Sequence, residues 1–154
     1  MAVHAIGMNL EGVIERIKNN NMRRVIGCML LFVLGSCAAQ YTTSPSGLQY
    51  IILKKGKGVK AVLGDEILLY ETTAYRNGTI LYSNENSDNP IKIKMGAGHV
   101  TAAVEEGLQG MQVGEIKQLI APPVLVKRSF YPENTSPDST LVITMRLYKN
   151  LSRH

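Results

Sequence analysis

The sequence of 154 residues predicts an α+β domain in which antiparallel strands form a half-barrel over one short α-helix. Short segments of alternating apolar and polar residues recur along the chain, and Gly, Asn and Pro separate them, which is typical of antiparallel strands. One stretch, between His99 and Pro123, has the spacing of an amphipathic helix followed by a strand. A helix this short is unstable alone in water, so it requires a sheet to pack against.

Most of the predicted strands are connected by short turns. Asn77–Gly78 is the strongest hairpin signal, because these residue types accept the positive φ angles of a tight turn. The connection Val124–Ser139 is long for a compact domain, which is typical of a functional or mobile segment. In chain order, strands are predicted at Leu48–Leu53, Glu66–Tyr75, Ile80–Ser83, Ile91–Met95, Glu115–Ala121 and Thr140–Tyr148.

The helical segment has one continuous apolar face. Its small residues, Ala103 and Gly107, predict close packing against the sheet. Thr101 is predicted as the N-cap, and Glu105 and Glu106 place negative charge near the positive end of the helix. The apolar face is formed at helical intervals by Val100, Val104, Leu108 and Met111.

The composition favours a folded globular protein, and no metal or cofactor is expected. The hydrophobic fraction is 45%, and the formal net charge is +5. The lysine cluster Lys54–Lys60 lies at a predicted strand edge without stacking aromatic residues, so no nucleic acid is expected as a partner. After Cys37 the histidines are His99 and His154, which do not have the spacing of metal ligands. His99 is predicted to lie on the rim of a site and not to act in catalysis.

The N-terminal region has the features of a bacterial lipoprotein signal. Met22-Arg23-Arg24 precedes an apolar run, residues 25–33, that is too short for an ordinary membrane span. Leu34-Gly35-Ser36-Cys37 then resembles a lipobox, which implies that Cys37 becomes the lipid-modified first residue of the mature chain. The alternative is a membrane-anchor helix with two incidental cysteines.

These features predict a division of the chain into four segments. Residues 1–21 are interpreted as an over-extended reading frame, because Met22 followed by two arginines is the natural start of a signal. Residues 22–36 are predicted as the signal peptide, residues 37–46 as a polar tether and residues 47–150 as the folded domain. We expect the protein to be attached to a bacterial membrane, with the outer membrane favoured over the inner one and the domain facing the periplasm.

Turn and packing motifs of the folded segment stand in the order and spacing of a known family. They are Ser46–Tyr50, Gly64–Asp65, Asn77–Thr79, Glu106–Met111 with Val113–Gly114, Ile120–Pro122 and Ser139–Leu141. From about Gly47 to Asn150, the chain resembles the FKBP-type peptidyl-prolyl cis-trans isomerases. The resemblance implies an FKBP-like half-barrel, prolyl isomerase activity, and a partner that is a proline-containing peptide or an unfolded or envelope protein.

The positions of the family's pocket imply a site with fewer aromatic rings. The family's indole floor falls on Val104, its aromatic walls fall on Leu81, Ile91 and Ile143, and its flap tyrosine falls on Val126. Since an aromatic side chain buries about 150–250 Å², these replacements imply an apolar pocket that is shallower or differently shaped.

Three further positions complete the implied pocket. Val100 fits the family's pattern. Thr101 replaces an aliphatic side chain, but its backbone N–H, the family's donor to the substrate carbonyl, is retained. Tyr131 is expected near the tip of the flap, where it would offer a substitute hydroxyl.

Glu71 and Tyr82 look like an exchange of the family's tyrosine and aspartate. On the predicted strand, Glu71 shares a face with Leu69 and Thr73. We expect Glu71 and Tyr82 to hydrogen-bond across the pocket wall. The alternatives are a solvent-facing Glu71 on a sheet edge, and a one-residue bulge that brings Tyr70 to the family's tyrosine position.

The sequence leaves three functions open. The first is a lipid-anchored prolyl isomerase or folding helper of the cell envelope, with weak or altered activity. The second is peptide or protein binding without catalysis. The third is a subunit of an envelope assembly, similar to the FKBP-like lipoproteins attached to gliding machinery. The family spacing favours the first function, whereas the loss of pocket aromatics favours the second.

Overall fold

The computed structural model describes residues 40–128 and 136–153, all within a compact unit that runs from Ala39 to His154. The signal peptide, Cys37 and Tyr131 lie outside the described residues. The elements are β1 (Thr42–Thr43), β2 (Gln49–Lys54), β3 (Glu66–Tyr75), β4 (Ile80–Ser83), β5 (Ile91–Lys94), α2 (Ala102–Leu108), β6 (Ile116–Ala121), the 3₁₀-helix η2 (Pro123–Leu125) and β7 (Leu141–Asn150). The predicted strands are confirmed, and their ends differ from the predictions by at most two residues.

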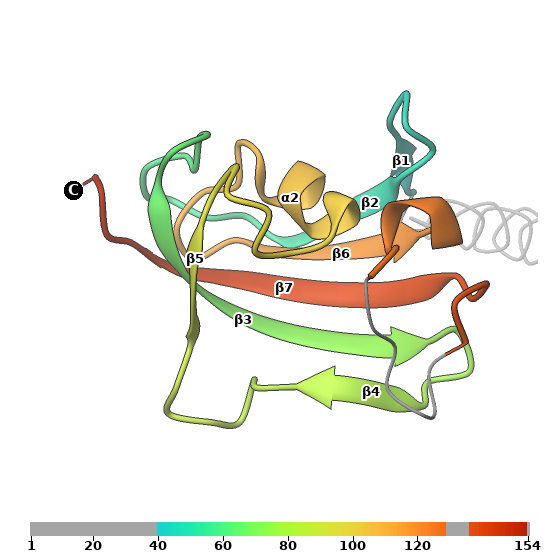
Figure 1. Cartoon of the computed structure of the whole chain (residues 1–154). Coiled ribbons are helices and arrows are strands. Elements are labelled where there is room, and N and C mark those ends of the chain that lie inside the picture. The colour runs from blue at the N-terminus through green and yellow to red at the C-terminus, as the bar shows by residue number, and fades with distance from the viewer. Residues whose placement is uncertain (1–39, 129–135, 154) are drawn as a thin grey trace, which may run out of the picture. The chain divides into compact units, whose positions relative to one another are not determined.

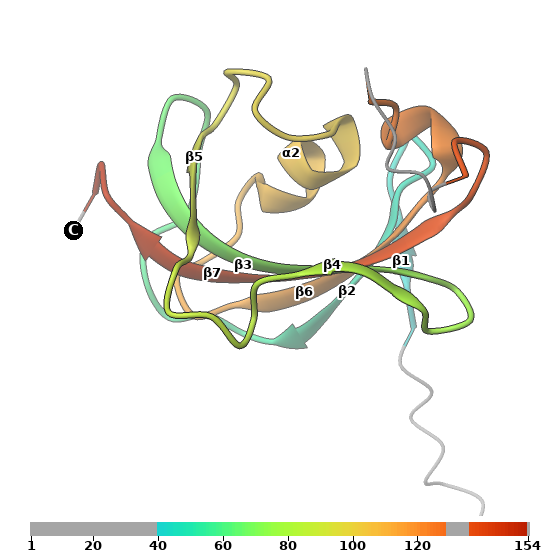
Figure 2. The same ribbon diagram turned by 60° about the horizontal axis from the view of Figure 1, so that its bottom comes forward.

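The described strands form one antiparallel sheet in the order β1-β2-β6-β7-β3-β4, and β5 pairs with β3 as well (Figure 1). The sheet is curved, and α2 lies on its concave side (Figure 2). The core is formed between the concave face and α2, where Leu119, Met145 and Leu147 are fully buried. The expected fold class, an antiparallel half-barrel over one short helix, is confirmed.

Strand β3 has two partners along one of its edges. Its N-terminal half pairs with β5 through Glu66–Leu69, and its C-terminal half pairs with β4 through Thr72–Ala74. Its other edge pairs with β7 from Ile67 to Tyr75. As predicted from the alternation, one face is buried, and it carries Ile67, Leu69, Glu71 and Thr73.

Gly107 allows α2 to lie directly on the sheet. A Cβ atom at this position would be 2.7 Å from Cδ1 of Leu119 and 2.8 Å from Cε of Met145. The predicted close packing of the small residues is therefore confirmed. The helix buries Ala103, Val104, Gly107 and Leu108.

A buried lysine supports the C-terminal end of α2. The ammonium of Lys117 on β6 donates a hydrogen bond of 2.9 Å to the carbonyl oxygen of Gly107, which satisfies one of the free carbonyls at the helix end. Burial lowers the pKa of Lys117, and the carboxylate of Glu115, 3.4 Å from the ammonium, acts in the opposite direction. The ammonium also lies 5.5 Å from the centre of the Tyr50 ring. Strand β6 therefore holds the helix by polar as well as apolar contacts.

The sheet begins earlier than predicted, within the segment interpreted as a tether. Thr42 and Thr43 pair with β2 as a two-residue strand. The turn that follows is closed by a hydrogen bond of 2.8 Å from the N–H of Ser44 to the carbonyl of Leu48. A strand of two residues has no detectable alternation, so the sequence pattern did not reveal it.

The end of β7 is attached to the start of β3 through Asp65. Its carboxylate accepts hydrogen bonds from the Asn150 side chain at 2.8 Å and the Arg153 guanidinium at 2.9 Å. Burial raises the pKa of Asp65, but these bonds and one from the N–H of Val62 lower it further, so the pKa lies below its ordinary value. This cluster joins the C-terminal end of the domain to the turn before β3.

Gly107→Ala should destabilise the fold by up to about 2 kcal/mol, because the usual cost of overpacking a core, about 1–3 kcal/mol, is partly offset by the higher helix propensity of alanine. The added methyl would meet Leu119 and Met145, although alanine favours a helix by about 1 kcal/mol. Urea unfolding followed by circular dichroism measures the change. Ala102→Gly, at the exposed first residue of the same helix, is a control outside the packed face and should cost less than the roughly 1 kcal/mol of a glycine in a helix interior. A Gly107→Ala protein as stable as the original would contradict the close packing.

Candidate functional site

A cavity of about 450 Å³ is formed where the start of α2 faces the β3–β4–β5 side of the sheet. It is lined by residues of these three strands, the turn before α2, the first turn of α2 and the segment after η2. The lining residues are Glu71, Tyr82, Ile91, Gly98, His99, Val100, Thr101, Val104, Lys127 and Arg128. Since these segments are distant in the sequence, the site exists only in the folded chain.

The structure brings most of the predicted pocket residues together, but not all of them. Leu81 is half-buried against the core and does not line the cavity. Val126 and Ile143 belong to the core and are only 2% and 0% exposed. Ile143 pairs with both β3 and β6 in the middle of the sheet, where the core covers it. Tyr131 lies outside the described residues. The predicted residues that do line the cavity are Glu71, Tyr82, Ile91, Val100, Thr101 and Val104.

The apolar part of the cavity is aliphatic. Val104 comes from α2 and is 2% exposed, while Ile91 from β5 and Val100 from the turn before α2 are half-buried. Tyr82 is the one aromatic residue among the described lining residues, and it is 44% exposed. The position expected for an indole floor is thus occupied by a side chain that belongs mainly to the core.

The carboxylate in the lining is buried. Glu71 is 7% exposed, and its Oε1 accepts a hydrogen bond of 2.7 Å from the hydroxyl of Thr73, which lies on the same face of β3. Burial raises the pKa of Glu71, while the Thr73 hydrogen bond and the positive charge of Arg128 act in the opposite direction. The Glu71 carboxyl therefore takes up a proton more readily than an exposed glutamate.

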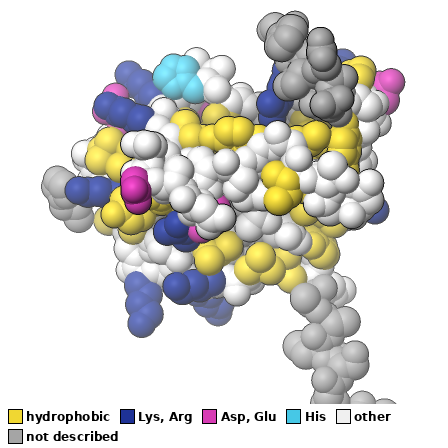
Figure 3. Space-filling model, turned by 90° about the horizontal axis from the view of Figure 1, so that it is seen from below, with side chains coloured by type: hydrophobic (Ala, Val, Ile, Leu, Met, Phe, Trp, Pro, Cys, Tyr) yellow, Lys and Arg dark blue, Asp and Glu magenta, His cyan; other side chains and the backbone are white. Residues whose placement is uncertain are grey.

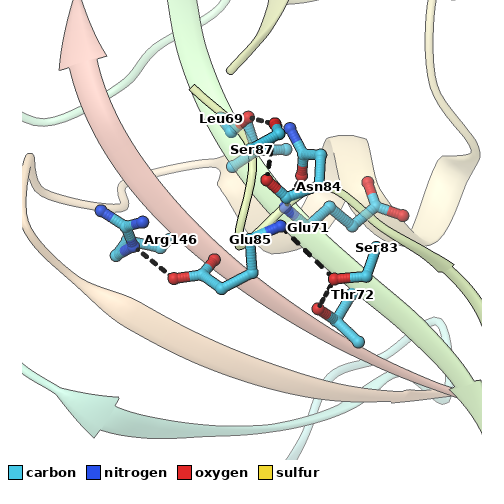
Figure 4. A network of polar contacts seen from close by, with 8 residues as sticks. All are labelled: Leu69, Glu71, Thr72, Ser83, Asn84, Glu85, Ser87 and Arg146. Carbon is cyan, nitrogen blue, oxygen red and sulfur yellow. Dashed lines mark hydrogen bonds and ion pairs between the residues drawn. The ribbon is translucent and has the colours of Figure 1, made fainter. Parts of the chain in front are cut away.

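Asn84 holds the backbone of β3 beside Glu71. Its Oδ1 accepts a hydrogen bond of 2.7 Å from the N–H of Glu71, and its Nδ2 donates at 3.3 Å to the carbonyl of Leu69. Leu69 is the last residue of β3 that pairs with β5, and Glu71 directly precedes the part that pairs with β4, so Asn84 bonds the backbone where β3 changes its partner. The carboxylate of Glu71 points away from this network (Figure 4).

The expected hydrogen bond between Glu71 and Tyr82 is not formed, because Thr73 offers a donor on the same strand. Both residues are described, and the Tyr82 hydroxyl has no hydrogen-bond partner among the described residues. Neither alternative is correct either. Glu71 is buried, and Tyr70 lies on the opposite face of β3, where its ring is 5.6 Å from that of Tyr148.

Thr101 is the N-cap of α2 by position but not by hydrogen bonding. Its φ and ψ of −69° and 158° are those of an N-cap, yet its side chain forms no capping bond. Its Oγ1 is buried and, within the described part of the chain, has no partner. The backbone N–H of Thr101 also donates to no described acceptor, as is common for the first N–H groups of a helix. Thr101, a lining residue of the cavity, therefore carries a backbone donor without an acceptor among the described residues.

Basic side chains line the outer part of the cavity. Lys127 and Arg128 follow η2 and are exposed, and His99 is exposed in the turn before α2, at the rim as expected. The Nδ1 of His99 accepts a hydrogen bond of 3.4 Å from the N–H of Lys94. Figure 3 shows a strip of hydrophobic side chains between a histidine and Lys or Arg side chains. The pair Lys127-Arg128, next to the predicted flap position, was the overlooked signal in the sequence.

Comparisons with known proteins agree with the resemblance found in the sequence. The family model of the FKBP-type peptidyl-prolyl cis-trans isomerases matches residues 57–148. FK506-binding protein 2 of Candida glabrata is 34% identical over 101 residues, which cover 62% of this chain and 74% of that protein. The peptidyl-prolyl cis-trans isomerase Mip of Chlamydia muridarum is 29% identical over 103 residues, covering 67% of this chain and 41% of that protein. The crystal structure of AtFKBP13 superposes with a TM-score of 0.64 at 26% identity, covering 72% of this chain and 98% of that one.

Glu71→Gln should make the fold more stable at pH 7, because it removes a buried charge and keeps an acceptor for Thr73. The pKa of Glu71 is raised in the folded state, so the folded protein holds a proton at pH values where the unfolded chain has released it. The free energy of unfolding of the original protein should therefore fall as the pH rises from the ordinary value of 4.5 to the raised pKa. The variant should lose less stability across this interval.

Urea unfolding at a series of pH values between 4 and 8 measures this difference. Asp88→Asn, which removes an exposed carboxylate from the loop after β4, is the control and should leave the pH profile unchanged. If the free energy of unfolding changed with pH in the same way in the original protein and in Glu71→Gln, the ionisation of Glu71 would not contribute to the pH dependence of stability.

Proposed function

Because the chain belongs to the FKBP-type peptidyl-prolyl cis-trans isomerase family, we propose that it is a lipid-anchored prolyl isomerase or folding helper of a bacterial cell envelope, with weak or altered activity. Its substrates are proline-containing segments of unfolded or envelope proteins. The observation that carries the proposal is a cavity of about 450 Å³ with an aliphatic interior and a free backbone donor at Thr101.

Prolyl isomerisation requires rotation about an amide and little acid or base chemistry. The barrier is about 18–20 kcal/mol, because resonance keeps the amide planar. Uncatalysed exchange takes roughly tens to hundreds of seconds. A twisted amide is less polar than a planar one, so an apolar site that excludes water favours the rotated state. An acceleration of about 10⁴-fold requires about 5.4 kcal/mol.

The described residues supply the groups for such a reaction. The side chains of Ile91, Val100 and Val104 offer an apolar surface to the proline ring. The N–H of Thr101 would donate a hydrogen bond to a substrate carbonyl, and the free hydroxyl of Tyr82 is a second donor in the same lining. No proton has to be transferred, so the buried Glu71 has no required role in the rotation.

The weak or altered activity follows from the aliphatic interior. A valine at position 104 offers less contact area than an aromatic ring, and it is 2% exposed, so little of it faces a ligand. The cavity then excludes less water around the proline and holds the twisted amide less firmly.

The same observation favours a second candidate, in which the cavity binds peptides or takes part in an envelope assembly without catalysis. Binding requires only that a peptide with a planar prolyl amide places its proline ring against the apolar lining and accepts a hydrogen bond from the backbone donor. Catalysis requires tighter binding of the twisted amide than of the planar one. An isomerisation assay therefore separates the two candidates.

The envelope location rests on sequence features before residue 40. The apolar run and the lipobox-like Leu34-Gly35-Ser36-Cys37 support a lipid on Cys37, and the polar residues after Cys37 would connect it to β1. Within the part of the chain that the structure describes, no helix is long and apolar enough to cross a membrane.

Val104→Trp should raise kcat/KM for prolyl isomerisation at least about tenfold, equivalent to about 1.4 kcal/mol. An indole would enlarge the apolar floor under the proline ring. The assay uses the full chain in a non-ionic detergent with a proline-containing peptide, and Val104→Leu is the control that adds volume without a ring. Circular dichroism shows whether each variant is folded. Activity of the original chain far above the uncatalysed rate would contradict the weak-activity proposal.

Cys37→Ala should abolish incorporation of labelled palmitate in a bacterium that processes lipoproteins, and it should shift the protein out of the membrane fraction. The lipid is expected on the thiol of Cys37. Cys28→Ala is the matched control, because Cys28 lies within the predicted signal peptide and is removed with it. Equal labelling of the two variants would exclude Cys37 as the lipidated residue.

A further inference from the structure

The basic side chains that line the cavity are exposed to solvent, whereas the carboxylate in the lining is buried. Lys127 and Arg128 are exposed lining residues, and the exposed His99 lines the cavity from the turn before α2. Glu71, the carboxylate among the described lining residues, is 7% exposed and accepts its hydrogen bond from Thr73. A ligand that enters from solvent therefore meets cationic side chains before it meets the carboxylate.

From this arrangement we infer that the cavity prefers prolyl peptides with an acidic side chain next to the proline. The inference rests on the proposed function and adds the class of substrate. With the proline ring against Ile91 and Val104, a neighbouring carboxylate would lie at the outer part of the cavity, where the ammonium of Lys127 can pair with it. Arg128 contributes a charge of the same sign.

The buried carboxylate does not cancel this preference. The Thr73 hydroxyl and the charge of Arg128 both act on Glu71, and this lining residue is only 7% exposed. Lys127 is the exposed lysine of the lining, and it reaches solvent at the opening. A lysine next to the substrate proline would be repelled by Lys127, so the cavity should discriminate by the sign of the charge.

The preference requires a tethered anion. Exposed ion pairs in water contribute little on their own, so a free anion would not be retained by Lys127 and Arg128. A carboxylate attached to a peptide whose proline occupies the aliphatic part is held near the lysine at a high effective concentration. The two contacts therefore act together, and the class of ligand is an acidic prolyl peptide.

Fluorescence anisotropy with the full chain in a non-ionic detergent tests the inference. The probes are three peptides with the same uncharged dye that differ only in the residue before proline, which is Glu, Gln or Lys. The Glu peptide should bind up to about fivefold more tightly than the Gln peptide, which is the upper limit expected for an exposed ion pair, and the Lys peptide should bind more weakly than both. Raising the salt from about 0.05 M to about 0.5 M should reduce the difference.

Lys127→Glu should reverse the order of the three peptides. Lys149→Glu is the matched control, because it makes the same charge change on β7 outside the cavity lining, and it should leave the order unchanged. Equal affinities for the three peptides, or an unchanged order in Lys127→Glu, would overturn the inference and leave the proposed function intact. If no proline peptide binds and no isomerisation is detected, the proposed function fails as well.

Discussion

Gly107 lets α2 lie close on the sheet, and the position of α2 in turn places one wall of the site. A Cβ atom at Gly107 would lie 2.7 Å and 2.8 Å from the side-chain ends of Leu119 and Met145, so a larger residue would require these side chains or the helix to move. The close approach also brings the Gly107 carbonyl within 2.9 Å of the Lys117 ammonium. A helix of seven residues is too short to persist alone, so these contacts with β6 and β7 keep it helical. They thereby fix its first turn, with the free N–H of Thr101, as one wall of the cavity.

The opposite wall depends on how β3 changes partners. Its neighbour is β5 as far as Leu69 and β4 from Thr72, and Asn84 bonds backbone groups of Leu69 and Glu71 where the partner changes. Tyr82 and Ile91 enter the lining from the two strands on either side of this break, and Glu71 enters from β3 itself. One long strand with two short partners thus brings three different side chains to the same cavity. A single continuous partner strand would place only alternate residues of one element there.

The fold could be predicted from local patterns, whereas the contacts of the site could not. Strand β3 was predicted at both ends, because ten residues alternate between turn signals, and Gly107 was predicted to pack closely because of its size. Ile143 was placed in the pocket by its position in the family, but the middle of a sheet is covered by the core. Glu71 was assigned to Tyr82, although Thr73 lies nearer on the same face. Which of two donors satisfies a carboxylate depends on side-chain geometry, which alternation does not encode.

In the proposed function, the aliphatic interior of the cavity acts on the proline, and the basic outer part acts on the residues beside it. Rotation of an amide is favoured by excluding water, and in the proposed function that would depend on the aliphatic lining residues, such as Ile91 and Val100. Lys127 is exposed and lies outside this apolar region, so its charge acts on the flanking residues of a peptide and not on the rotating bond. A site with little aromatic surface gains less affinity from the proline ring itself. In the inferred preference, the choice among peptides would therefore come mainly from the outer charges.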